Sequence, residues 1–227
     1  MRIVTWNCNM SFSKKLKKLL ALKPDIAVIQ ECEEDLPALP DGVSHYWYGN
    51  DTRKGVCILS FNGSISLDTS FSNTWTYFIP VNTNGLKILA VWAYNHRASR
   101  FGHDKQGKPL QILPFLDAWL DNSNTIILGD FNNSVVWDKP RSGNNFADIS
   151  NYLDKMGFKS AYHKFSGQTY GIETDATFYH IKKHDKQYHI DYCFCPKTSK
   201  LQNVQVGKYH DWIEYSDHAP IIVDIIL

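Results

Sequence analysis

The segment Gly129-Asp130-Phe131-Asn132 follows the apolar run at residues 125–128, which predicts a buried strand ending in a carboxylate and an amide. Side chains two residues apart on a strand point to the same face, so Asp130 and Asn132 can approach one ligand. In open α/β sheets, ligands bind outside the carboxyl ends of the strands. The motif alone is a weak indicator, and its meaning depends on what stands at the other strand ends.

Further polar clusters occur where other apolar runs stop. They are Asn7 with Asn9, Gln30-Glu31, Tyr94 with Asn95, His96 and Arg97, and the late segments His189-Ile190-Asp191 and Ser216-Asp217-His218. Each cluster also has a structural interpretation. Asn7 and Asp217 can serve turns, in which such residues are common. Glu31 can pair with a lysine, and Tyr94 can belong to the core. Taken together, so many amides and carboxylates at predicted strand ends favour a shared site.

Two of these clusters carry ligands suited to a hard divalent cation. Mg²⁺ prefers carboxylate oxygens and keeps several of its waters. Glu31 and Asp217 can therefore anchor one Mg²⁺, with Asn9 or Asn7 nearby.

Other residues of these clusters suit the attack of water on a phosphodiester. This reaction needs an oriented water and relief of charge on the phosphoryl group. Asp130 can accept a proton from the water, and Asn132 and Asn7 can donate hydrogen bonds to phosphate oxygens. Asp191 can fix the tautomer of His218, which would orient the water or contact the phosphate.

The pattern of apolar residues predicts the elements that position these side chains. Strands are expected at residues 3–6, 25–29, 55–60, 64–67, 75–81, 86–94, 125–128, 177–180, 189–195, 201–206 and 219–227, and helices after a Ser13 cap, at 110–120 and at 146–156. Lys14, Lys15, Lys17 and Lys18 are interpreted as the solvated face of the first helix, with a phosphate-binding patch as the alternative. Residues 96–109 are polar and predict a loop. This order of elements favours an α/β fold with mixed sheets and outer helices.

Composition narrows the class of protein. One domain spanning residues 1–227 is expected, since no linker divides the chain. The formal net charge of +1 excludes a strongly basic nucleic-acid coat but leaves a local basic patch open. Cys193 and Cys195 have no second matching pair, so buried free thiols in a reducing compartment are favoured over a zinc site. Without a visible signal peptide or an apolar span, a cytoplasmic monomer is expected, with no protein partner inferable.

The order and spacing of these motifs resemble the endonuclease/exonuclease/phosphatase superfamily, which has the DNase I-like fold. The segments that carry the resemblance are Asn7, Gln30-Glu31, Gly129-Asp130-Phe131-Asn132, Ile190-Asp191-Tyr192 and Ser216-Asp217-His218. They extend over essentially the whole chain. The resemblance implies a four-layer α/β sandwich, with two mixed β-sheets packed face to face and helices outside. It also implies hydrolysis of phosphoesters by in-line attack of water, with Mg²⁺ or Mn²⁺ as cofactor.

The resemblance also implies roles for single residues. Glu31 resembles the principal metal ligand and Asp217 a helper near it. Asp130 resembles the residue that aligns or deprotonates the water, and Asn132 a phosphate contact. The remaining pair, Asp191 and His218, resembles the hydrogen-bonded pair in which the histidine faces the scissile phosphate.

Three positions bear on the subgroup. Tyr94 stands where exonuclease III-like repair nucleases carry a tyrosine, which favours a repair nuclease. The segment Asn9-Met10-Ser11 departs from those enzymes, which carry an acid after the first asparagine, so Asn9 is a weaker candidate ligand. His189 stands where arginine is common.

A nuclease that acts on DNA or RNA is the first hypothesis for the substrate. Side chains expected to bind it, by stacking or by charge, are Arg97, Trp137, Phe178, Tyr188 and His189. Tyr179 and the basic residues Arg100, His103, Lys105 and Lys108 extend this set. The alternative for each ring is packing at the edge of the sandwich. A phosphatase or phosphodiesterase for a small molecule or lipid phosphoester is the second hypothesis, and a non-catalytic nucleic-acid-binding module is the third.

Overall fold

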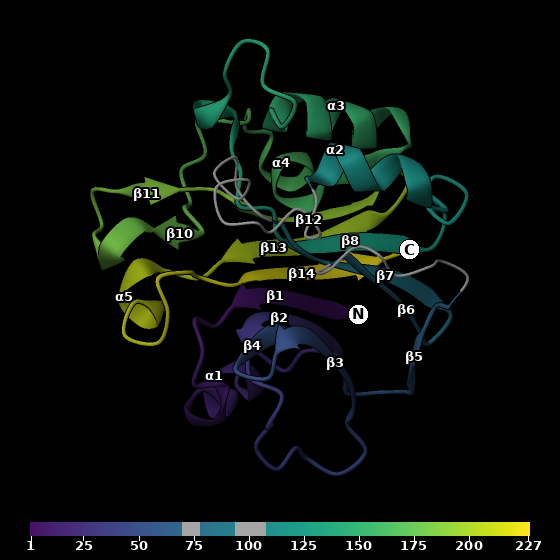
Figure 1. Cartoon of the computed structure of the whole chain (residues 1–227), viewed down its shortest axis with the longest axis vertical. Coiled ribbons are helices and arrows are strands. Elements are labelled where there is room, and N and C mark those ends of the chain that lie inside the picture. Colours follow the sequence, from purple (N-terminus) through teal and green to yellow (C-terminus); the bar gives the residue numbers. More distant parts are fainter. Residues whose placement is uncertain (70–77, 94–107) are drawn as a thin grey trace.

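The computed structural model describes residues 1–69, 78–93 and 108–227 of the chain. Within these residues two sheets of six strands each pack against one another, and a small two-stranded ribbon lies at one end (Figure 1). Helices cover the outer faces of both sheets. The predicted α/β sandwich is thereby confirmed.

The first sheet joins the two ends of the chain. Its strands, in spatial order, are β13 (Lys200–Val206), β14 (Ile221–Ile226), β1 (Arg2–Asn7), β2 (Ile26–Cys32), β4 (Lys54–Ser60) and β3 (Ser44–Asp51). Strand β1 runs parallel to β2 and antiparallel to β14. This pairing brings the segment after β1 beside the segment before β14.

The second sheet contains the strand that ends in Gly129 and Asp130. Its order is β5 (Ile65–Leu67), β6 (Phe78–Thr83), β7 (Leu86–Trp92), β8 (Thr125–Asp130), β12 (Asp191–Pro196) and β9 (Phe158–Ser160). Strand β8 is parallel to β7 and antiparallel to β12, so the end of β8 meets the beginning of β12. The ribbon consists of β10 (Phe178–Tyr179) and β11 (Gln187–Tyr188).

Strand β8 shows how the sheets share the core. Ile126 and Leu128 lie in the apolar layer between the sheets, whereas Ile127 packs outward against the helices. The strand is buried on both faces, which explains why its sequence is continuously apolar. Because the side-chain period is two, Asp130 is the next residue to face the other sheet.

Most of the helices belong to the outer layers, whereas the one at Ala161–Ser166 contacts strands of both sheets. They are α1 (Leu16–Leu20), α2 (Pro109–Ile112), α3 (Phe146–Lys155), α4 (Ala161–Ser166) and α5 (Tyr209–Trp212). Figure 1 shows α2 and α3 beyond the second sheet and α1 beyond the first. In the described parts of the chain, no helix has the length and apolar character needed to cross a bilayer.

Some predicted elements differ from the observed ones. The helix expected at 110–120 is shorter than predicted and interrupted, since α2 passes at Leu113 into a 3-10 turn that ends at Leu116 and holds Pro114 in its first positions. A proline in a helix interior lacks the amide donor and clashes with the preceding turn. The first helix begins after Lys15 rather than after a Ser13 cap. Strand β3 was not predicted, because its side chains are only partly buried and show no clear alternation.

Lys15 corrects the interpretation of the lysine cluster. Its side chain is buried, whereas Lys14 and Lys17 are exposed and Lys18 is half-buried. The Lys15 ammonium donates hydrogen bonds to the backbone carbonyls of residues 8, 9 and 10. It therefore stabilises the loop that follows β1.

The cysteines are the buried free thiols that the sequence predicts. All five are buried and none forms a disulfide. Burial raises the pKa of the Cys193 thiol well above its usual range, as expected of an unreactive core thiol.

Candidate active site

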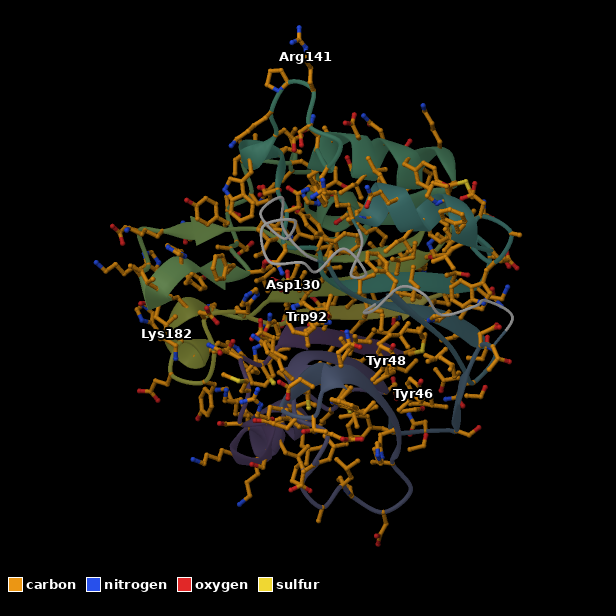
Figure 2. All side chains as sticks on the ribbon, in the orientation of Figure 1. Tyr46, Tyr48, Trp92, Asp130, Arg141 and Lys182 are labelled. Carbon is orange, nitrogen blue, oxygen red and sulfur yellow. The ribbon has the colours of Figure 1, made fainter. Side chains whose placement is uncertain are left out.

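At one edge of the two sheets, most strands end in a polar side chain that faces the other sheet. The last inward residues are Asn7 on β1, Gln30 on β2, Trp92 on β7, Asp130 on β8 and Asp191 on β12. Trp92 and Asp191 are the register partners of Asp130 on its two neighbouring strands. Figure 2 shows Asp130 and Trp92 near the centre of the molecule, where the sheets meet. The site thus lies at the end of the layer between the sheets.

Asn7 connects the two sheets at this edge. Its Nδ2 donates to Glu31 Oε1 at 3.1 Å and to Asp130 Oδ2 at 3.0 Å. Asn132 supports Asp130 from the other side, with Nδ2 at 3.1 Å from Oδ2 and the backbone amide at 2.8 Å from Oδ1. Nδ2 of Asn132 also donates to the Ala93 carbonyl at 2.9 Å. Both amides therefore hold carboxylates in place in this structure.

Glycine is required at position 129 by the close approach of β7. Its φ is +148°, and an added Cβ would lie 1.8 Å from the Val91 carbonyl oxygen. Any other residue would push β8 away from β7 and displace Asp130, the next residue.

His218 and Asp191 form a buried ion pair. His218 Nδ1 lies 2.9 Å from Asp191 Oδ2, and the side chains are 6% and 1% exposed. Burial lowers the pKa of His218, but the charge and hydrogen bond of Asp191 outweigh it, with support from Asp130 and Asp217. The net effect raises the pKa of His218 to about 10. The histidine is therefore an imidazolium at neutral pH.

The pKa of Asp130 is raised as well, but for a different reason. Burial raises its pKa well above the usual range, and the neighbouring charge of Asp191 adds to the effect. The charge of His218 and the hydrogen bonds from Asn7 and Asn132 oppose this rise. A buried carboxyl group with a raised pKa thus lies beside an ion pair, an arrangement typical of sites that move protons.

Three residues outside the predicted set fix this arrangement. Thr177 Oγ1 accepts the backbone amides of residues 190 and 191, each at 3.0 Å. The hydroxyl of Ser216 donates to the Asn7 carbonyl at 2.7 Å and accepts the amide of His218 at 3.0 Å. Trp6 Nε1 donates to the His218 carbonyl at 3.0 Å. Only Ser216 had a signal in the sequence, as the first residue of the Ser-Asp-His segment.

Glu31 and the loop after β1 form a second acidic region beside Asn7. Asn9 Nδ2 donates to Asp217 Oδ1 at 3.0 Å, and the Asn9 amide donates to Asn7 Oδ1 at 3.0 Å. Glu31 Oε2 lies 2.8 Å from Lys54 Nζ. Hydrogen bonds therefore link the predicted metal-binding residues in series, from Glu31 to Asn7, from Asn7 to Asn9 and from Asn9 to Asp217.

The donors fit a hard divalent cation. Glu31, Asp217 and Asn9 supply oxygen atoms of the kind that Mg²⁺ and Mn²⁺ take. Ligand atoms of Asp130, Asp191 and His218 also lie within 4.8 Å of one another. Among the described residues Asp191 Oδ1 has no hydrogen-bond partner although it is buried, and such an oxygen calls for an unseen binding partner.

A row of aromatic rings leads away from His218. The ring of Phe178 lies 4.7 Å from that of His218, and Tyr188 stacks on Phe178 at 6.4 Å. Trp137 continues the row, 4.8 Å from Tyr188. The β10–β11 ribbon positions Phe178 and Tyr188, and an isolated bridge joins Phe178 to His218.

His189, which was also predicted to bind substrate, does not join this row. His189 is 3% exposed, and its Nδ1 lies 2.8 Å from the Asp175 carbonyl. It packs on Tyr162 and reaches only the wall of a small cavity beside Tyr188. The direction of the side chain explains this, since His189 follows Tyr188 and points to the opposite face. Tyr94 and Arg97 lie outside the described residues, as do Asn95, His96, Arg100, His103 and Lys105.

The two packed sheets, with polar residues at one shared edge, have the DNase I-like fold. A sequence profile described as "Endonuclease/Exonuclease/phosphatase family" matches residues 4–218, and the chain belongs to this family. Comparison with curated protein sequences gave no significant match.

Solved structures with this fold resemble the whole chain at low sequence identity. The 3′–5′ exonuclease NExo from Neisseria meningitidis is 19% identical, with a TM-score of 0.75 and full coverage of both chains. The endonuclease domain of TRAS1, a telomere-specific non-LTR retrotransposon, is 15% identical, with a TM-score of 0.68 over 100% of this chain and 98% of that chain. The catalytic domain of Xenopus laevis APE2 is 17% identical, with a TM-score of 0.68 over 99% and 91%.

Proposed function

We propose that this protein is a nuclease that hydrolyses phosphodiester bonds of DNA or RNA with the help of Mg²⁺ or Mn²⁺. The observation that carries the proposal is the row of Phe178, Tyr188 and Trp137, which begins at the ring of His218. Stacked aromatic rings beside a basic group suit the bases of a single strand whose phosphate lies at the histidine. A small phosphoester would need no such row.

His218 is the residue expected to contact the scissile phosphate. Its bond to Asp191 uses Nδ1, so Nε2 is the nitrogen that a phosphate oxygen would meet. The raised pKa keeps the ring protonated, and a buried imidazolium stabilises charge that develops on the phosphoryl group. Asp191 maintains both the charge and the orientation of the ring.

Asp130 is the residue expected to take a proton from the attacking water. A general base works best when its pKa lies near the working pH, and the raised pKa of Asp130 moves it in that direction. Asn7 and Asn132 hold both of its oxygens. Because their Nδ2 groups are engaged in this way, contact of either amide with phosphate would require the exchange of one of these bonds.

Glu31, with Asp217 and Asn9, would hold the divalent cation, and Asp191 and Asp130 offer a second position. When bound, a hard cation would supply charge stabilisation at the phosphate oxygens. The names of the similar structures agree with a nucleic-acid substrate, since they describe an exonuclease and an endonuclease domain.

A substrate panel tests the proposal. Single-stranded, double-stranded, nicked and abasic DNA and single-stranded RNA would be incubated with Mg²⁺ or Mn²⁺, and bis(p-nitrophenyl) phosphate would serve as a small phosphodiester. EDTA-sensitive cleavage of nucleic acid is the expected result. Turnover of small phosphoesters alone would favour the second hypothesis, and salt-dependent binding without turnover would favour the third.

Variants of the aromatic row sharpen this test. Phe178→Ala and Tyr188→Ala should each weaken oligonucleotide binding about 5- to 100-fold, as expected for the loss of one stacked base. Neither should change turnover of bis(p-nitrophenyl) phosphate. Phe165→Ala removes a ring that is 48% exposed on α4 and serves as the matched control. If oligonucleotide binding and turnover of bis(p-nitrophenyl) phosphate fell equally, the aromatic row would no longer support a nucleic-acid substrate.

A further inference from the structure

Lys54 enters the candidate metal site from a strand that carries no predicted site residue. Its Nζ lies 2.8 Å from Glu31 Oε2 and 5.4 Å from the centre of the Trp92 ring. The lysine begins β4, in which Val56 and Ile58 face the second sheet. By the period of two, Lys54 faces the same way and reaches the edge where the sheets meet.

A β-bulge brings Glu31 to this lysine. The register between β2 and β4 passes from Gln30 opposite Val56 to Cys32 opposite Gly55, so Glu31 is the extra residue. Its φ is +57°. In a regular strand Glu31 would follow Ile29 toward the outer helices, but the bulge turns it toward Asn7 and Lys54.

Both carboxylate oxygens of Glu31 are consequently engaged. Asn7 donates to Oε1 and the Lys54 ammonium is paired with Oε2. Only 17% of the Glu31 side chain is exposed, so the ion pair is poorly screened by solvent. A divalent cation bound directly to Oε2 would lie within a few ångströms of the ammonium, and like charges at such separation repel strongly.

We propose that Lys54 is an internal competitor for the divalent cation at Glu31, so that metal binding requires the ammonium to leave the carboxylate. This inference rests on the proposed function, in which Glu31 is a metal ligand. The Lys54 side chain is 39% exposed, which gives the ammonium room to move away. Lys54 would thereby lower the affinity for metal and keep Glu31 neutralised in its absence.

The test measures metal affinity rather than turnover. Free Mn²⁺ would be quantified by electron paramagnetic resonance during titration of the full-length protein, first for the wild type and for Lys54→Gln. The glutamine variant should bind Mn²⁺ at least about 10-fold more tightly, equivalent to about 1.4 kcal/mol. A purely structural role for Lys54 would not make its loss strengthen metal binding.

Three further variants complete the experiment. Lys54→Arg keeps the positive charge and should bind Mn²⁺ as weakly as the wild type. Lys159→Gln removes a lysine of similar exposure, 41%, that pairs with Asp154, and it should leave the affinity unchanged. In the double variant that combines Lys54→Gln with Glu31→Gln, the gain in Mn²⁺ affinity should disappear.

The outcomes separate the inference from the proposed function. Unchanged or weaker Mn²⁺ binding by Lys54→Gln, with metal-dependent hydrolysis intact, would overturn the role of Lys54 alone. Absence of metal-dependent hydrolysis in the wild type would overturn the proposed function. A gain that persists in the double variant with Glu31→Gln would show that Lys54 acts at another ligand and would also overturn the inference.

Discussion

The ion pair of Asp191 and His218 makes a quantitative prediction for Asp191→Asn. The substitution keeps the size of the side chain but removes the charge that is the main cause of the raised pKa of His218. Burial, which lowers that pKa, remains in the variant. We therefore expect His218 to be neutral at pH 7.5 in the variant and protonated in the wild type.

The magnitude follows from the size of the pKa change. The rise from 6.5 to about 10 corresponds to about 5 kcal/mol of preferential stabilisation of the imidazolium. Since the folded state binds this proton more tightly than the unfolded state, the associated stability is fully present below pH 6.5. It is lost as the pH rises toward 10. In Asp191→Asn the free energy of unfolding should lose this pH dependence, and phosphodiester hydrolysis should fall by about 10²- to 10⁴-fold.

Nuclear magnetic resonance of ¹⁵N-histidine-labelled protein in EDTA can measure the pKa directly. The signal of His218 is assigned by its absence in His218→Gln, which also serves as the control for the stability measurements. In the wild type we expect a titration above pH 9, and in Asp191→Asn one below about pH 7. Titration of His218 near 6.5 in the wild type, or above 9 in Asp191→Asn, would refute the reasoning.

Two predictions concern the supports of the site, and both are measured by urea unfolding. Gly129→Ala should lower the free energy of unfolding by more than about 3 kcal/mol, because the new Cβ would meet the Val91 carbonyl. Gly143→Ala, where an added Cβ meets nothing within 4 Å, should change it by less than about 1 kcal/mol; equal effects would contradict the steric argument. Lys15→Met should destabilise the protein by about 1–3 kcal/mol, since it leaves buried carbonyls without a donor. It should also weaken Mn²⁺ binding through the loop that carries Asn9, and a fully stable variant would show that the carbonyls find other partners.

The sequence predicts those site residues that obey the period of two. Asp130 follows two inward apolar residues of β8, and Asp191 opposes it across an antiparallel pair, so strand pattern and residue type suffice. His218 was assigned to the same site from its residue type and its place before an apolar run, and the resemblance of the Ser-Asp-His segment supports that assignment. Its hydrogen-bond partner is Asp191, which lies 27 residues earlier in the chain at the beginning of β12 and raises the pKa of the histidine.

The remaining features depend on contacts that no local pattern encodes. Lys15 resembles its neighbours in the sequence, yet its ammonium is buried because the loop after β1 needs a donor for three carbonyls. Glu31 lies on the outward parity of β2 and reaches the site only through a bulge set by β4. Lys54 comes from a strand whose sequence offers no chemical signal. Such tertiary effects override the local pattern.

Asn7 connects these separate features into one system. It is the last inward residue of β1, and it hydrogen-bonds one carboxylate from each sheet, Glu31 from the first and Asp130 from the second. Lys54 forms an ion pair with Glu31, and His218 forms one with Asp191, the register partner of Asp130. A cation that displaces Lys54 would bind to Glu31, and Asn7 donates hydrogen bonds both to Glu31 and to Asp130, the expected base. Since one amide group holds both carboxylates, metal binding at Glu31 and proton affinity at Asp130 should be coupled through Asn7.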